Sequence, residues 1–257
     1  MAMPTRTPPA FVRLAAHPLR WRLLTELAAG DHRVRDLVAL VGEPQSLVSY
    51  HLRLLRDGGL VSATRSSFDG RDSYYRLNLD NCAAALADTG AALHPALGRE
   101  PAAARGVPAT LRRSPPIEVL FVCTGNSARS PVAEALLRHH SQGVVAATSA
   151  GGRPRPRLHP GAVRTLRDAY GIDIAGQRPR HWDSLAGRRF DYVISLCDKA
   201  RESCPDLPGR PRRLHWSVPD PATSDAPEAA DDLVFQRVTA DIDGRVRNLL
   251  PVLAANP

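Results

Sequence analysis

Apolar residues in the first third of the chain recur at the three- and four-residue spacing of a helix. Residues 14 to 28 gather Leu19, Leu23, Leu24 and Leu27 on one side, and residues 34 to 41 repeat the pattern over a shorter length. Gly42-Glu43-Pro44 then interrupts the periodicity. The spacing predicts two helices, each with one buried face, separated by a turn from whatever follows.

A third helix is predicted over residues 45 to 57, within the phrase QSLVSYHLRLLRDGGLV. The apolar positions expected to face inward are Leu47, Val48, Leu52 and Leu55. Two short helices around a tight turn, the second polar on its outer face, predict a helix-turn-helix. Small polar side chains near the start of such a helix approach base edges and phosphates without clashes. We therefore expect DNA contacts from Gln45, Ser46, Ser49, Tyr50, His51 and Arg53.

The next segment, residues 60 to 79, changes to the alternation of β-strands. Two β-prone runs, LVSATR and SYYRL, flank Asp69-Gly70, which is a strong signal for a tight hairpin turn. Arg65 and Arg71 lie on either side of that tip and are placed to touch phosphates. The alternative is a hairpin edge whose arginines are merely solvated.

A change of pattern divides the chain into two domains. Residues 99 to 116, REPAAARGVPATLRRSPP, have four prolines and no apolar periodicity, so they are predicted to be a linker. The domains are then residues 9–98, of α+β class, and residues 117–257. In the second domain short Val/Ile/Leu runs alternate with amphipathic segments, which predicts an α/β fold with a parallel sheet and a last helix over residues 233 to 253.

The start of the second domain carries the strongest chemical signal. IEVLFV, residues 117 to 122, reads as a buried strand that ends at Cys123, and Arg129 follows at the beginning of a helix for which Ser130 and Pro131 suit the N-cap and first position. Strand, tight loop and helix start aim successive amides at one point and bind a tetrahedral oxyanion. The same field favours a Cys123 thiolate, hence a nucleophile, and the alternative is a buried cysteine ending a core strand. The expected oxyanion-binding residues are Thr124, Gly125, Asn126, Ser127, Ala128 and Ser130, with Arg129 as a planar fork.

Composition adds limits to these motifs. The chain has 257 residues with a net charge of +8, an excess that fits nucleic-acid contact without proving it. Its four cysteines are Cys82, Cys123, Cys197 and Cys204, a set more typical of catalysis or metal binding than of structural disulfides in a reducing compartment. No run approaches the roughly 20 apolar residues of a membrane span, and MAMPTRTPPA lacks an apolar signal core. We expect a cytoplasmic protein with no membrane partner.

The phrase SLVSYHLRLLRDGGLV followed by GRDSYYRL resembles the winged helix-turn-helix repressors of the ArsR-like family, over residues 9 to 97. The resemblance implies a homodimer, formed through the N-terminal domain, on a double-stranded DNA operator with inverted repeats, released by a metal or metalloid. Family sensors hold arsenite with closely spaced cysteines before the recognition helix, where DHRVRDLVALVG has none. Cys82 is the domain's single thiol and is expected to pack as a small hydrophobe, with a pair across the dimer as the alternative.

The loop VCTGNSARSP resembles that of the low-molecular-weight protein tyrosine phosphatases and of the arsenate reductases that share their three-layer α/β fold, over residues 117 to 251. Phosphatases of the family use an aspartate in an Asp-Pro loop as general acid, and Asp220-Pro221 is present. Ala222 stands where an aromatic is expected, and Ala128 where phosphatases usually carry a second cysteine. Taken by itself, Asp220 is better explained as a turn residue before proline.

The stretch DYVISLCDKARESCPDLPG resembles the thioredoxin-coupled arsenate reductases, whose three cysteines correspond here to Cys123, Cys197 and Cys204. The resemblance implies a disulfide relay: Cys123 attacks arsenate with Asp220 as proton donor, Cys197 attacks Cys123, and Cys204 moves the disulfide to where a thioredoxin-like reductant reaches it. No tightly bound cofactor and no catalytic metal are expected. The resemblance also implies a potassium ion near the loop, for which Asn126, Glu134 and Ser149 match part of the ligand set. The rival hypotheses are a phosphatase fused to a DNA-binding domain and a regulator that senses an oxyanion without turnover.

Overall fold

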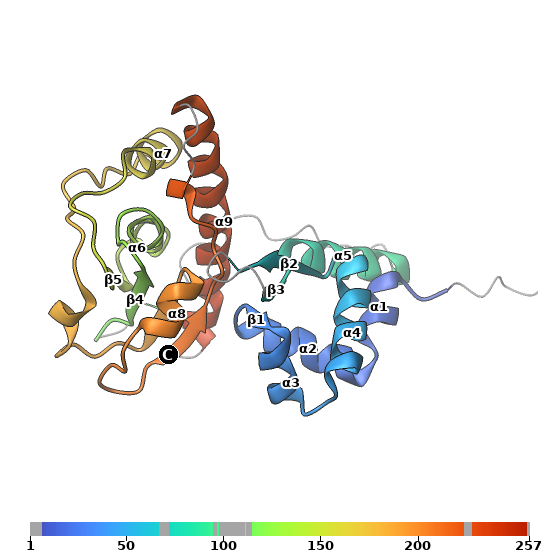
Figure 1. Cartoon of the computed structure of the whole chain (residues 1–257). Helices are drawn as coiled ribbons and strands as arrows, with labels where there is room; N and C mark the ends of the chain where they lie inside the picture. The colour runs from blue at the N-terminus through green and yellow to red at the C-terminus, as the bar shows by residue number, and fades with distance from the viewer. Residues whose placement is uncertain are drawn as a thin grey trace, which may run out of the picture. The chain divides into compact units, whose positions relative to one another are not determined.

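The computed structural model describes residues 7–66, 72–94, 97, 111, 115–223 and 228–255. The chain divides into two compact units, residues 1–105 and 106–257 (Figure 1). None of the helices in the described ranges is long and apolar enough to cross a membrane.

The first unit is a helical bundle with a small antiparallel sheet at one edge (Figure 1). Its helices are α1 (Ala10–Ala15), α2 (Pro18–Ala29), α3 (Val34–Val41), α4 (Gln45–Asp57) and α5 (Leu79–Leu93). Its strands are β1 (His32–Arg33), β2 (Val61–Arg65) and β3 (Ser73–Leu77), in the order β1-β3-β2. Leucines from α2, α3 and α4 form one buried core, so the predicted winged helix-turn-helix is confirmed. The predicted turn at Asp69-Gly70 and Arg71 lie outside the described residues.

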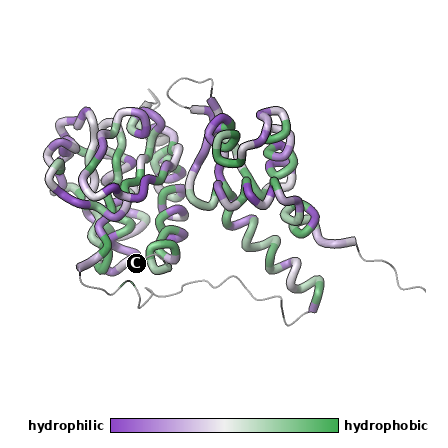
Figure 2. Tube along the Cα trace, turned by 90° about the horizontal axis from the view of Figure 1, so that it is seen from below, coloured by the Kyte–Doolittle hydropathy of each residue, from purple (hydrophilic) through white to green (hydrophobic). Residues whose placement is uncertain are grey.

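Three details of this unit differ from the expectation. The helix predicted over residues 14 to 28 is two helices, because Pro18 starts a new one and the His17 ring accepts the amide of Leu19 as its N-cap. Leu47 is 39% exposed rather than buried. Helix α5 was not predicted; none of its residues is buried, although Figure 2 colours it mostly hydrophobic.

The second unit is built on a four-stranded parallel sheet in the order β5-β4-β6-β7, which confirms the predicted α/β class. The strands are β4 (Glu118–Cys123), β5 (Ala146–Gly151), β6 (Tyr192–Ser195) and β7 (Arg212–His215). The helices are α6 (Arg129–His140), α7 (Pro160–Tyr170), α8 (Asp198–Ser203) and α9 (Glu228–Ala255), with 3-10 turns at Trp182–Leu185 and Pro221–Thr223. Helix α6 packs on β4, β5 and α9, while α8 packs on β4 and β6 (Figure 1). Helix α9 begins five residues before the predicted start at residue 233.

Strand order explains where the functional site of this unit can form. Every residue of β4 after Glu118 is buried, and so is all of β6, as expected for apolar strands covered on both faces. The chain leaves β4 toward β5 on one side and later returns to β6 on the other, so β4 lies at a topological switch point. Ligands bind at the carboxyl ends of the strands at such a point. Those ends are Cys123 and the residues just after Ser195.

Candidate functional site

The loop between β4 and α6 turns its carbonyls outward. Three of its carbonyl oxygens accept amides from the segment after β5: Thr124 from Arg153 (2.9 Å), Gly125 from Arg155 (2.9 Å) and Ser127 from His159 (2.8 Å). Within the described ranges, no acceptor is bonded to the amides of residues 125 to 128. These amides together with the start of α6 can therefore serve a bound anion, as the sequence predicts.

Asn126 fixes the shape of this loop from inside. Its backbone has a φ of 44°, in the left-handed region that asparagine tolerates better than most residues. Its side-chain amide donates to Ser130 Oγ (3.0 Å) and to Ser149 Oγ (2.9 Å), and its oxygen accepts the amide of Arg180 (2.8 Å). Asn126 is thus buried structural support rather than a side chain that points at the anion.

Gly151, which the sequence analysis did not single out, lies directly against the loop. A Cβ at this position would come within 2.7 Å of the Thr124 carbonyl oxygen and 2.8 Å of the Asn126 nitrogen. The end of β5 therefore requires a residue without a side chain. The Gly151-Gly152 pair after a small-residue strand is the signal that could have indicated this close approach.

Cys123 lies at the floor of the loop and is 2% exposed. Its sulfur is 3.0 Å from Ser130 Oγ, a hydroxyl that can donate to a thiolate. The predicted capping role of Ser130 is wrong: α6 begins at Arg129, after the N-cap residue Ala128, whose side chain makes no capping hydrogen bond. Ser130 instead lies in the first turn of α6, buried, where its hydroxyl faces the sulfur.

Arg129 and Asp220 meet at the mouth of the same loop. The Arg129 guanidinium donates to Asp220 Oδ2 (2.7 Å) through one nitrogen and to the Val218 carbonyl (3.1 Å) through the other. Asp220 also accepts the amide of Ala222 (3.2 Å), as an aspartate in a turn does. The predicted proton donor and the predicted anion fork are therefore neighbours, although Asp220 is a third exposed and Arg129 is buried.

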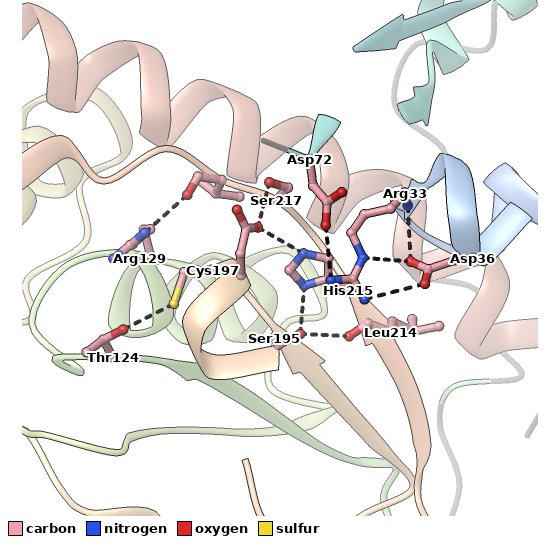
Figure 3. Close-up of polar contacts among 12 residues, drawn as sticks. Arg33, Asp36, Asp72, Thr124, Arg129, Ser195, Cys197, Leu214, His215 and Ser217 are labelled. Carbon is pink, nitrogen blue, oxygen red and sulfur yellow. Dashed lines mark hydrogen bonds and ion pairs between the residues drawn. The ribbon is translucent and has the colours of Figure 1, made fainter. Parts of the chain in front are cut away.

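Two further thiols flank helix α8. Cys197 is the N-cap residue of α8 and is buried, with its sulfur 3.3 Å from the Thr124 hydroxyl (Figure 3). Cys204 is the C-cap residue and is half-buried. All four cysteines are free thiols. Burial raises the pKa of Cys204, and the neighbouring Arg213 opposes that shift. Cys123 and Cys197 are thus brought to the same loop, whereas Cys204 is held apart at the far end of α8.

A buried polar cluster that sequence reasoning missed stands beside Cys197. Asp198 Oδ1 accepts the Ser217 hydroxyl (2.8 Å) and lies 3.2 Å from His215 Nε2, while His215 Nδ1 lies 2.8 Å from Ser195 Oγ (Figure 3). All four residues are buried. The cluster joins the start of α8 to the ends of β6 and β7, so it fixes the position of the residue next to the second thiol.

The predicted potassium ligands are only partly suited to a cation. Glu134 is buried, and its Oε2 has no hydrogen-bond partner, whereas Oε1 pairs with Arg138 (2.8 Å). Asn126, however, presents its amino group to Ser149 and gives its oxygen to Arg180, so its amide does not offer an oxygen ligand in this arrangement. Among the described residues no group of three or more His, Cys, Asp or Glu could hold a metal ion.

The predicted DNA-contacting residues of α4 divide between two faces. Gln45, Ser46, Tyr50 and Arg53 are exposed and Ser49 is half-buried, and Arg65 is exposed at the end of β2. His51 is the correction: it is 5% exposed and its ring lies 4.3 Å from the ring of His17. Three positions after Val48, it belongs to the buried stripe of the helix. Burial is the main reason why its pKa is lowered, followed by the charges of His17 and Arg20.

Comparison with known proteins matches the two parts of the chain to two different families. Residues 118–256 match the family model of the low molecular weight phosphotyrosine protein phosphatases, and residues 17–63 match that of the bacterial regulatory proteins of the arsR family. Relatives named arsenate reductase include those of Shouchella clausii, 36% identical over 131 residues, and Bacillus subtilis, 35% identical over 129 residues. Each covers 50% of this chain and 91% of the relative. The crystal structure of an arsenate reductase from Archaeoglobus fulgidus is 32% identical, covers 52% of this chain and 99% of that one, and gives a TM-score of 0.44. The chain thus belongs to the low molecular weight phosphotyrosine protein phosphatase family and carries an arsR-type helix-turn-helix ahead of that domain.

Proposed function

We propose that the second domain reduces arsenate to arsenite with electrons from its own thiols. The observation that carries this proposal is the hydrogen bond between Cys197 and Thr124, because it holds a second thiol on the residue that directly follows Cys123. Hydrolysis of a phosphate ester needs a single nucleophile under the anion, so phosphatase chemistry does not require Cys197. Two thiols beside one anion can supply the two electrons that reduction of arsenate requires.

In the first step the Cys123 thiolate displaces one oxygen of arsenate held by the loop amides and Arg129. That oxygen leaves as water, and we assign one of the protons it takes to Asp220, which lies 2.7 Å from the Arg129 guanidinium. The Cys197 thiolate then attacks the Cys123 sulfur. The sulfur–arsenic bond breaks, its electron pair stays on arsenic, and arsenite leaves a Cys123–Cys197 disulfide behind.

The second exchange requires helix α8 to unwind. Cys197 and Cys204 cap its two ends and are seven positions apart, which corresponds to roughly 10 Å along a helix at about 1.5 Å per residue. A disulfide needs Cα atoms within about 7 Å. Once the segment has opened, Cys204 attacks Cys197, Cys123 leaves as a thiolate, and the Cys197–Cys204 disulfide becomes available to a thioredoxin-like reductant.

The test is arsenate-dependent NADPH oxidation through thioredoxin and its reductase, run on the wild type and on Cys123→Ser, Cys197→Ser and Cys204→Ser. The relay predicts that all three variants lose multiple turnover. Normal recycling by Cys204→Ser would remove the last exchange from the mechanism. Hydrolysis of aryl phosphates without arsenate turnover would identify a phosphatase instead, and binding of arsenate with neither activity would identify an oxyanion sensor. A potassium requirement is tested in the same assay by exchanging potassium for sodium, with Glu134→Gln as the matched variant.

We propose that the first domain binds a double-stranded DNA operator as a homodimer. The exposed polar side chains of α4 and Arg65 support the DNA contact. The dimer is supported by exposed apolar surface on α5. Its leucines at seven-residue intervals, Leu79, Leu86 and Leu93, are exposed in the described part of the chain. A groove of about 490 Å³ beside exposed Trp21, between α1 and α2, adds to that surface. Surface of this kind on a small domain marks an interface.

Two variants separate the parts of this proposal. Leu86→Glu should give a monomer in sedimentation and, as a consequence, lose operator binding. Arg53→Gln should remain dimeric and lose affinity at low salt, with a smaller salt dependence because a phosphate contact is gone. A Leu86→Glu protein that remains dimeric would place the interface elsewhere.

A further inference from the structure

Strand β7 contacts both ends of the segment that must move. Arg213 and His215 are two positions apart on β7, so their side chains project from the same face of the strand. His215 contacts Asp198 at the start of α8, and Arg213 contacts the residues that follow its end. We call residues 197 to 206, which carry both thiols, the redox segment.

The start of the redox segment is held by buried contacts. Asp198 is 2% exposed and shares its Oδ1 between Ser217 and His215, which is itself bonded to Ser195. Breaking these contacts would leave several buried polar groups without partners, and each such group is costly. Figure 3 shows the cluster gathered at the base of α8, next to Cys197.

The other end is held by contacts that water can replace. Arg213 donates to the Pro205 carbonyl (2.6 Å) and to the Cys204 carbonyl (3.4 Å), and it pairs with Asp206 (3.1 Å). Its side chain is 40% exposed, and that of Asp206 is fully exposed. An exposed ion pair contributes little, so this end needs much less free energy to open than the Asp198 end. The next anchor along the chain is Leu207, which is buried in the core.

We propose that Arg213 is the latch of the redox segment: it holds Cys204 away from Cys197, and its release lets the segment open from the Cys204 end while Asp198 stays in place. The proposal rests on the proposed relay. In the step that follows release, the Cys204 sulfur loses its proton to solvent and forms the Cys197–Cys204 bond. The Cys123–Cys197 bond breaks, and its electron pair leaves with the Cys123 thiolate. Arg213 is a positioning residue, since it does not contact arsenate and releases Cys204 before that sulfur reacts.

The ionisation of Cys204 agrees with a latch. Burial is the main reason why its pKa is raised in the closed segment, and it outweighs the opposing charge and hydrogen bond of Arg213. A closed segment therefore keeps Cys204 protonated and unreactive, and opening removes the burial. A thiol of this kind reacts from the open state, in which Arg213 no longer touches it.

The test compares Arg213→Met with Arg212→Met in the full chain. Arg212 precedes Arg213 on β7 and is exposed, so its variant removes the same charge without touching the redox segment. Hydrogen–deuterium exchange is measured on peptides covering residues 199–206 and 212–218. Arg213→Met should raise exchange in the first peptide roughly two- to fivefold, the effect of one exposed ion pair, and leave the second unchanged. Equal exchange in the two variants would overturn the latch, whether or not the chain reduces arsenate.

The second measurement follows one turnover of arsenate, with disulfides trapped by acid and mapped by mass spectrometry. Arg213→Met should form the Cys123–Cys197 disulfide at the wild-type rate and pass it to Cys204 about two- to fivefold faster. A slower transfer would mean that Arg213 activates the thiol in place, and the latch would be wrong. Absence of any Cys123–Cys197 disulfide in the wild type would contradict the proposed function, while the exchange result on the latch would still stand.

Discussion

Among glycine-to-alanine substitutions at the described glycines of the second domain, Gly151→Ala should disturb the anion loop most. The new Cβ would lie 2.7 Å from the Thr124 oxygen, 2.8 Å from the Asn126 nitrogen and 3.0 Å from the Cys123 oxygen. Ordinary contact begins at 3.4 Å, so the loop must withdraw by about 0.7 Å. All three atoms are backbone, and none can turn aside as a flexible side chain would.

The expected cost follows from that displacement. Overpacking of this kind destabilises a core by about 1–3 kcal/mol. The larger effect falls on catalysis, because a misplacement near 1 Å at a reacting centre costs about 10²-fold. We therefore expect arsenate turnover per enzyme to fall between roughly 10- and 100-fold, with weaker binding of arsenate or phosphate measured by calorimetry. The loss should exceed what the change in stability explains at a temperature where the variant is folded.

Gly187→Ala is the matched control for this substitution. A Cβ at Gly187 meets nothing within 4 Å, and its backbone is not in the left-handed region. The same added methyl should therefore leave turnover unchanged. Turnover by Gly151→Ala within twofold of Gly187→Ala would refute the reasoning, because it would show that the amides of the loop need not hold this geometry.

Two further outcomes follow from buried polar groups. Asp198→Ala should lower the free energy of unfolding of the second domain by about 2–4 kcal/mol, since His215 and Ser217 lose a buried partner. Ser217→Ala should lower the free energy of unfolding by only about 1 kcal/mol. If urea titrations gave the same loss for Asp198→Ala and Ser217→Ala, Asp198 would not be the central partner of the cluster. Burial chiefly, then His17 and Arg20, lowers the pKa of His51 below 6.5, so the unfolded state binds a proton that the folded state resists. The first domain should therefore be fully stable above pH 6.5 and lose stability as the pH falls below that value. His51→Gln should reduce the pH dependence of the thermal midpoint between pH 5 and 7, whereas the same substitution at exposed His94 should leave that dependence unchanged.

The parts of the site that could be predicted are those written in one continuous stretch. Cys123, Arg129 and the loop between them belong to a single strand–loop–helix unit, so their spacing alone indicates an anion site. The helix-turn-helix is local in the same sense. The prediction that His51 contacts DNA was wrong because a polar residue is expected on the outer face of a helix. His51 instead lies on the buried stripe between Val48 and Leu55.

What could not be predicted depends on how distant strands align. Asp198 meets His215 because β6 and β7 are parallel neighbours in which Ser195 pairs with His215, a register that neither segment reveals. Gly151 matters because β5 ends beneath a loop that precedes it by more than twenty residues. Helix α5 was missed because its many alanines offer little contrast between faces, and its leucines Leu79, Leu86 and Leu93 are exposed.

The burial of the three thiols gives the proposed relay its direction. Cys123 and Cys197 are 2% and 3% exposed, so a protein-sized reductant cannot reach a disulfide between them. Cys204 is half-buried at the end of a polar segment whose outer contacts are the weakest around α8. Transfer of the disulfide to Cys204 therefore moves it outward and frees Cys123 at the same time, before any reductant arrives. A chain with only Cys123 and Cys197 would have to open the anion loop itself to be reduced, and the loop is anchored by Asn126 and by three backbone hydrogen bonds. A third thiol on the segment that opens most easily lets the anion site stay rigid through the cycle, which preorganised binding of an oxyanion requires.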